Sequence, residues 1–148
     1  GVTSMFTSAL ITGGIGPWLG YQVFAAAWIG VGAGLLPHKI RGTIEIAMLI
    51  VYGALAAELF GILMDLQFWP WSLGSGTQLS FLPGASISEN LSKFFTFHFA
   101  TAMAWDLPRA TFTVVFIALA GKSVLAALRR SYTRAAFLTP IQFIERVK

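Results

Sequence analysis

The sequence contains no cysteine among its 148 residues. The chain therefore has no disulfide, no thiol nucleophile and no thiolate ligand for an iron–sulfur cluster. Charged residues are also scarce, at 11% of the chain, whereas an average soluble domain has about 25%. Hydrophobic residues make up 56%, and the mean hydropathy is +0.74. This balance argues against a soluble domain and predicts an all-α, polytopic helical membrane protein.

Three apolar runs are long enough to cross a hydrocarbon core of about 30 Å, which takes roughly 20 helical residues. They cover residues 18–36, 43–66 and 107–128. Pro37 and Pro70 follow the first two runs, and Pro108 suits the first turn of the third. We expect residues 67–106 to form a cap outside the membrane, with a turn-rich first half and a helical segment at 87–105.

The first residues resemble the second half of an apolar helix, with no charged segment before them. A signal peptide needs a positively charged start, so this pattern argues against one. We therefore expect residues 1–148 to be a single transmembrane domain that is truncated at its N-terminus.

The basic residues predict the orientation, because cytoplasmic loops carry an excess of lysine and arginine. Only Lys93 and Arg109 belong to the outer side of the predicted arrangement. The other eight of the ten fall at the ends of spans that would share the cytoplasmic side: Lys39, Arg41, Lys122, Arg129, Arg130, Arg134, Arg146 and Lys148. Although the pI is 9.9, this placement indicates a topology signal and argues against a nucleic-acid partner.

Small residues recur every fourth position in two of the spans. The first series begins at Gln22 and continues through Ala26, Gly30 and Gly34, and the second contains Gly53, Ala57 and Gly61. Such series let helix backbones approach closely in lipid, so both predict packing faces.

Glu58 lies more than halfway along the second span, where a carboxylate is costly unless it faces protein or water. Gly61 and Asp65 share its helical face, which suggests a polar cavity open to the outside. The alternative is that a protonated Glu58 makes only a helix–helix hydrogen bond.

His98 shares one face of the 87–105 segment with Phe94, Thr101 and Trp105. This face would stack a planar ring and offer a hydrogen bond, or it would serve only as an aromatic belt at the membrane surface. No second histidine, cysteine or carboxylate lies three or four residues from His98. The sequence thus predicts no metal site and no cofactor.

Asp106 and Arg109 are three residues apart at the start of the third span. They would either form a helix cap with a local ion pair or contact a polar ligand above the helix end. The sequence shows no nucleophile paired with a base, so we expect no enzymatic activity.

The order of motifs resembles the substrate-specific components, or S components, of energy-coupling factor importers of the actinobacterial type. The motifs are GPWLGYQVFAAAWIGVGAGLLP, the FWPW loop, FLPGAS, FHFATAMAWDLPRA and AGKSVLAALRR, and the resemblance extends over nearly the whole chain. The block FH…WD-x-x-RA is its most specific part.

The resemblance implies the C-terminal part of a six-helix bundle in the bacterial cytoplasmic membrane. It also implies capture of a vitamin or related micronutrient from outside, for ATP-driven uptake with a membrane scaffold subunit and two ATPase subunits. A different hypothesis is an ion-coupled secondary transporter or a membrane enzyme that uses Glu58. The expected substrate site lies between the outer ends of the spans and consists of Gln22, Glu58, His98, Thr101, Trp105, Asp106 and Arg109.

Overall fold

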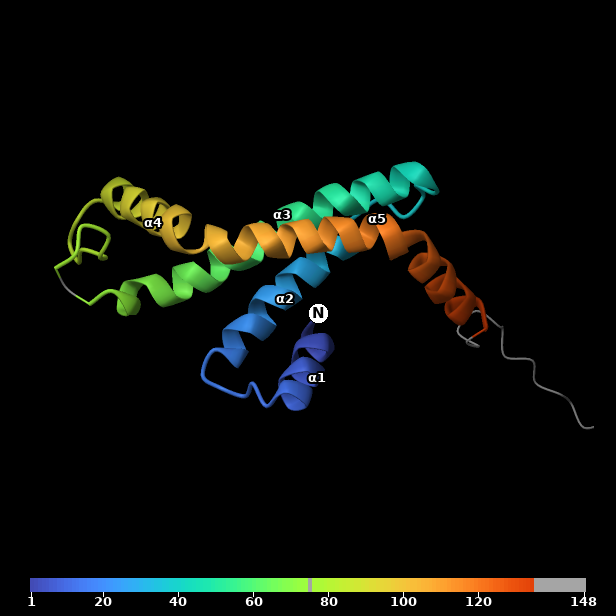
Figure 1. Ribbon diagram of the computed structural model, residues 1–148, viewed down its shortest axis with the longest axis horizontal. Coiled ribbons are helices and arrows are strands. Elements are labelled where there is room, and N and C mark those ends of the chain that lie inside the picture. The colour runs from blue at the N-terminus through green and yellow to red at the C-terminus, as the bar shows by residue number, and fades with distance from the viewer. Residues whose placement is uncertain (75, 135–148) are drawn as a thin grey trace, which may run out of the picture.

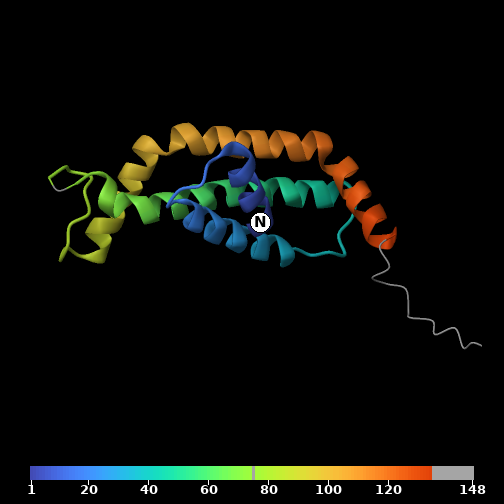
Figure 2. The same ribbon diagram turned by 90° about the horizontal axis from the view of Figure 1, so that it is seen from below.

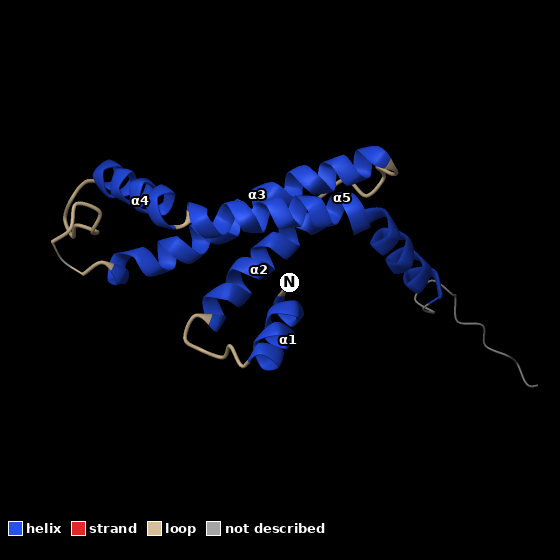
Figure 3. Cartoon of the chain, in the orientation of Figure 1, coloured by secondary structure: helices blue, strands red, loops and turns tan. Residues whose placement is uncertain are grey.

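The computed structural model describes residues 1–74 and 76–134, which form helices and loops and contain no strand (Figure 3). The elements are α1 (Val2–Thr12), α2 (Leu19–Gly34), α3 (Thr43–Ser72), α4 (Ile87–Thr101) and α5 (Met103–Arg134). The predicted all-α class is confirmed. The helical segment expected at 87–105 is present as α4 and the first turn of α5.

Two helices, α3 and α5, are long and apolar enough to cross a membrane. They contain 30 and 32 residues. At a rise of about 1.5 Å per residue, each is longer than a hydrocarbon core of about 30 Å. Helix α2 covers the first expected span but has only 16 residues, which corresponds to about 24 Å.

Helix α3 continues past the end expected at residue 66 and includes Pro70. The expectation of a turn-rich loop from residue 67 is therefore wrong for its first six residues, 67–72. Packing explains the difference, because the indole N–H of Trp69 donates to the Leu79 carbonyl at 2.7 Å. The same ring meets Phe81 and Phe94 edge to face, so the last turns of α3 are held despite the missing proline N–H.

Helix α5 begins at Met103, four residues before the expected start of the third span. Only Ala102 separates it from α4. Asp106 therefore lies inside the first turns of α5, and it is not a cap residue. Its side chain is directed into the protein instead, as described below.

Helices α3 and α5 run side by side along the long axis of the molecule (Figures 1 and 2). A Cβ atom added at Gly53 would lie 2.8 Å from Cδ1 of Ile117 and 3.0 Å from Cγ2 of Thr113. This close approach confirms that Gly53 belongs to a packing face.

Within the described residues, Gly30 and Gly34 of the predicted α2 face pack against no other helix. A Cβ at either position would meet no atom of the described residues within 4 Å. Instead, Gly32 on the other side of α2 faces Tyr52 of α3, whose hydroxyl donates to the Ile29 carbonyl. The absence of a side chain at Gly32 leaves room for the Tyr52 ring against α2.

The basic residues of the predicted cytoplasmic side gather at one end of the molecule. The loop between α2 and α3 and the C-terminal part of α5 lie at the same end, and α4 lies at the opposite end (Figure 1). Buried Glu45 forms ion pairs there with Arg129 and with Arg41, the latter at 3.7 Å. Arg146 and Lys148, which also belong to the predicted set, lie outside the described residues.

Candidate functional site

A cavity of about 480 Å³ lies where α3 meets the junction between α4 and α5. This volume is within the range of about 300–1,000 Å³ that is typical of small-molecule sites. Aromatic side chains on its wall come from Phe68, Phe97 and Trp105. The polar side chains are those of Asp65, Ser72, Thr101, Asp106 and Arg109.

Asp106 and Arg109 form an ion pair on this wall. The guanidinium Nη1 of Arg109 donates to Oδ1 of Asp106 at 2.6 Å and to the Ala57 carbonyl at 3.4 Å. Its central carbon lies 5.2 Å from the centroid of the Phe60 ring. The local ion pair predicted as one alternative is therefore present, and it also joins α5 to α3.

The carboxylate of Asp106 is almost completely buried, with 1% of the residue exposed. Its second oxygen, Oδ2, has no hydrogen-bond partner among the described residues. The carboxylate lies directly against Gly61, and a Cβ atom at that position would overlap with it. Gly61 is the third residue of the small-residue series in α3. Its lack of a side chain leaves the space that the Asp106 carboxylate occupies between α3 and α5.

His98 connects α4 to α3. Its ring Nδ1 lies 2.6 Å from Oδ2 of Asp65, and 2% of the residue is exposed. The ring stacks on Phe94 with centroids 6.1 Å apart and 21° between the planes. His98, which was predicted to stack on a ligand ring, stacks on Phe94 instead. Both residues lie on the buried side of α4.

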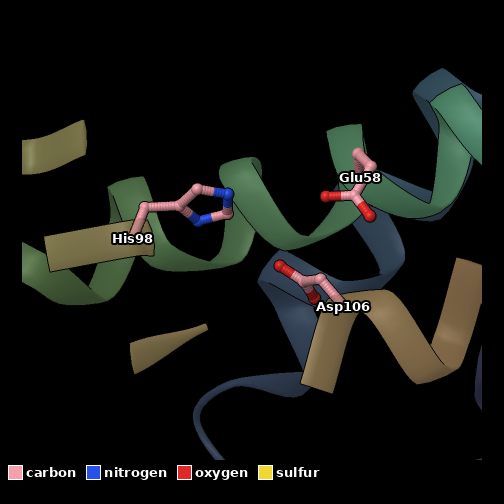
Figure 4. A group of neighbouring side chains, drawn as sticks. All are labelled: Glu58, His98 and Asp106. Atoms are coloured by element: carbon pink, nitrogen blue, oxygen red, sulfur yellow. The ribbon is translucent and has the colours of Figure 1, made fainter. Parts of the chain in front are cut away.

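Glu58, His98 and Asp106 each contribute one potential metal-ligand atom to a cluster in which these atoms lie within 4.8 Å of one another (Figure 4). The three residues come from α3, α4 and α5. The sequence indicated no metal site because no second ligand lies close to His98 within its own helix. The structure instead brings these three side chains together from three helices.

The structure separates the predicted site residues into three groups. Thr101, Trp105, Asp106 and Arg109 line the cavity. Glu58 and His98 lie beside the cavity, and each has a potential ligand atom within 4.8 Å of one on Asp106. Gln22 of α2 is half-buried and does not line the cavity.

Several wall residues were not among the predicted site residues, and Asp65 and Phe97 are two of them. Asp65 was recognised only as a residue on the same face as Glu58, and its spacing of seven residues was the signal that could have included it. Phe97 carries no such signal, because its inward direction depends on how α4 packs on Trp69.

No protein-family model, curated protein or solved structure matches this chain. Its function is therefore inferred from the residues around the cavity, together with the resemblance noted in the sequence.

Proposed function

We propose that this chain is the substrate-binding membrane subunit of an energy-coupling factor importer. In this proposal it captures a vitamin or related micronutrient outside the cell, and a scaffold subunit with two ATPase subunits drives uptake. The observation that carries the proposal is the wall of the cavity, where the Asp106–Arg109 ion pair adjoins aromatic side chains. The same residues belong to the FH…WD-x-x-RA block that resembles S components.

The chemistry of the wall favours a small ligand that is planar and polar. Phe68, Phe97 and Trp105 provide apolar and aromatic surface for a ring. Arg109 has donors beyond the one that bonds Asp106, and its side chain is partly exposed. Aromatic walls with a few convergent polar groups are the usual composition of small-molecule sites.

The placement of the charges supports an outward-facing cavity. The cavity lies at the α4 end of the molecule, away from the Glu45–Arg129 ion pair and the predicted cytoplasmic loop. In this orientation α3 and α5 cross the bilayer within a polytopic protein, and α4 covers the outer end.

The proposal is tested with the protein expressed from its own gene and purified with any attached subunits. We expect a membrane scaffold and two ATPases to co-purify, and mass spectrometry to identify a micronutrient released by heat.

Arg109→Ala should weaken rebinding of that compound roughly 5- to 150-fold, the equivalent of about 1–3 kcal/mol. The control Arg130→Ala removes an exposed arginine at the other end of α5 and should bind as the parent does. If the parent, Arg109→Ala and Arg130→Ala bind the compound equally well, the substrate site does not include Arg109.

A second candidate is an ion-coupled secondary transporter with Glu58 as the proton carrier. The observation in its favour is the proximity of Glu58 to His98 and Asp106, since proton relays in transporters use such chains. Uptake by liposomes that contain this protein alone distinguishes the two. Accumulation driven by a proton gradient without ATPases would support the second candidate and contradict the first.

A further inference from the structure

We propose that Glu58, His98 and Asp106 form a binding site for a divalent transition-metal ion beside the cavity. This inference goes beyond the proposed importer function, because it concerns the ion and not the identity of the compound in the cavity. Three helices each provide one ligand, and in Figure 4 the side chains of Glu58, His98 and Asp106 surround one common space.

The first argument comes from the free oxygen of Asp106. Leaving a buried polar atom without a partner costs about 1–3 kcal/mol, and more for a charged group. Oδ2 of Asp106 is in this situation among the described residues, while Oδ1 is held by Arg109. Coordination of a cation by the carboxylate would compensate for the missing hydrogen bond, and the ion pair with Arg109 would keep the side chain in position.

The second argument comes from the orientation of His98. A carboxylate accepts hydrogen bonds, so the short contact with Asp65 assigns the proton to Nδ1 of His98. In the neutral ring, the lone pair is then on Nε2. Histidines that bind metals usually have this arrangement, in which a carboxylate on one ring nitrogen orients the other toward the ion. Asp65 would thus be a positioning residue for the metal ligand His98.

The third argument is charge. Glu58, Asp65 and Asp106 bring three carboxyl groups into one region, where Arg109 pairs with Asp106. Carboxyl groups thus outnumber basic side chains here. A divalent cation would pair with them, which matters inside a membrane protein where isolated charges are expensive.

The ligand set also indicates the kind of ion. One imidazole with two carboxylates suits Zn²⁺, Mn²⁺, Co²⁺ or Ni²⁺, whereas Cu⁺ prefers sulfur and Mg²⁺ prefers oxygen alone. Bonds of about 2.0–2.2 Å require the three ligand atoms to draw closer than their present limit of 4.8 Å. Glu58 can supply this movement because its side chain is long and half-buried.

The test uses the purified protein with an affinity tag that contains no histidine, stripped with a chelator. Zn²⁺, Mn²⁺, Co²⁺ and Ni²⁺ are each titrated by calorimetry, with Mg²⁺ for comparison, and bound metal is counted by mass spectrometry after dialysis. We expect one transition-metal ion per chain and a higher thermal unfolding temperature when it is bound. Glu58→Gln, His98→Gln and Asp106→Asn should each weaken binding about 100-fold or more, and Asp65→Asn about 10- to 100-fold.

Matched controls are His38→Gln and Glu89→Gln, which change an exposed histidine and an exposed carboxylate outside the cluster. Both should bind the ion as tightly as the parent. If His98→Gln or Asp106→Asn does not fold, Glu58→Gln decides the question, because Glu58 has no ion pair among residues 1–74 and 76–134.

Absence of stoichiometric binding of all four ions by the parent overturns the proposal. Undiminished binding by Glu58→Gln, or a site occupied only by an organic cation, overturns it as well. Each of these outcomes leaves the importer proposal intact, since that proposal depends on the co-purifying subunits and micronutrient.

Discussion

Gly61 is the residue that makes room for the Asp106 carboxylate between α3 and α5. In Gly61→Ala the new methyl group would overlap with that carboxylate, and the helices or the aspartate would have to move. We expect a loss of about 1–3 kcal/mol in the free energy of unfolding, as for other overpacked interfaces. Thermal and denaturant unfolding in detergent measures this loss.

The matched control for this prediction is Gly34→Ala, because a Cβ there meets nothing within 4 Å in the described residues. Alanine favours helix over glycine by about 1 kcal/mol, so the control should be neutral or slightly more stable. A Gly61→Ala protein as stable as the control would show that the carboxylate is not held against α3.

The contact between His98 and Asp65 is the only hydrogen bond between side chains of α3 and α4 in the described residues. His98→Ala and Asp65→Ala should each lower stability, and the double substitution should lower it by less than their sum. The expected coupling is about 0.5–3 kcal/mol, the range for residues in direct contact. A coupling near zero in the double-mutant cycle would mean that the ring is positioned by its stacking on Phe94 alone.

At the scale of helices, charged groups join α3 and α5 at two places. Near the start of α5, the guanidinium of the Asp106–Arg109 pair donates to the Ala57 carbonyl of α3. Near the start of α3, buried Glu45 pairs with Arg129 of α5 across the interface. Between these two charged contacts, Gly53 allows the backbones to come close.

The Glu45–Arg129 ion pair gives a prediction for the stability of the α3–α5 pair. Glu45→Gln should lower the free energy of unfolding by about 1–3 kcal/mol, the range for hydrogen bonds to charged groups. Arg129 is partly exposed, so the lower half of that range is expected. Ligand affinity should stay unchanged because the cavity is at the other end.

Glu89→Gln is the comparison for this substitution. Its ion pair with Lys93 spans 4.0 Å on an exposed part of α4, and removing it should change stability by less than about 0.5 kcal/mol. Equal effects of the two substitutions on the unfolding midpoint would contradict the proposed role of Glu45.

At the scale of the whole molecule, the two ends of the α3–α5 pair should lie on opposite sides of the membrane. The chain has no native cysteine, so a single introduced cysteine reports one position. In intact cells, an impermeant thiol reagent should label Ser88→Cys of α4 and should not label His38→Cys until the cells are opened. The reverse pattern would invert the orientation predicted from the basic residues.

Much of the architecture follows from the sequence by itself. The runs of apolar residues predict α3 and α5, and Gly53 marks the face on which they meet. The positions of Lys39, Arg41 and Arg129 predict that the α2–α3 loop and the end of α5 lie together. These features are predictable because hydrophobicity, small residues and charge act locally or repeat with the helical period.

The tertiary structure alone decided where α3 ends, which side of α2 packs, and what surrounds His98. Trp69 holds the helix beyond Pro70 through contacts with Leu79 and Phe94, which are distant in sequence. The cluster of Glu58, His98 and Asp106 likewise draws one residue from each of three helices. The spacing of residues within one helix cannot predict this cluster, because the cluster depends on the angles and separations at which the helices cross.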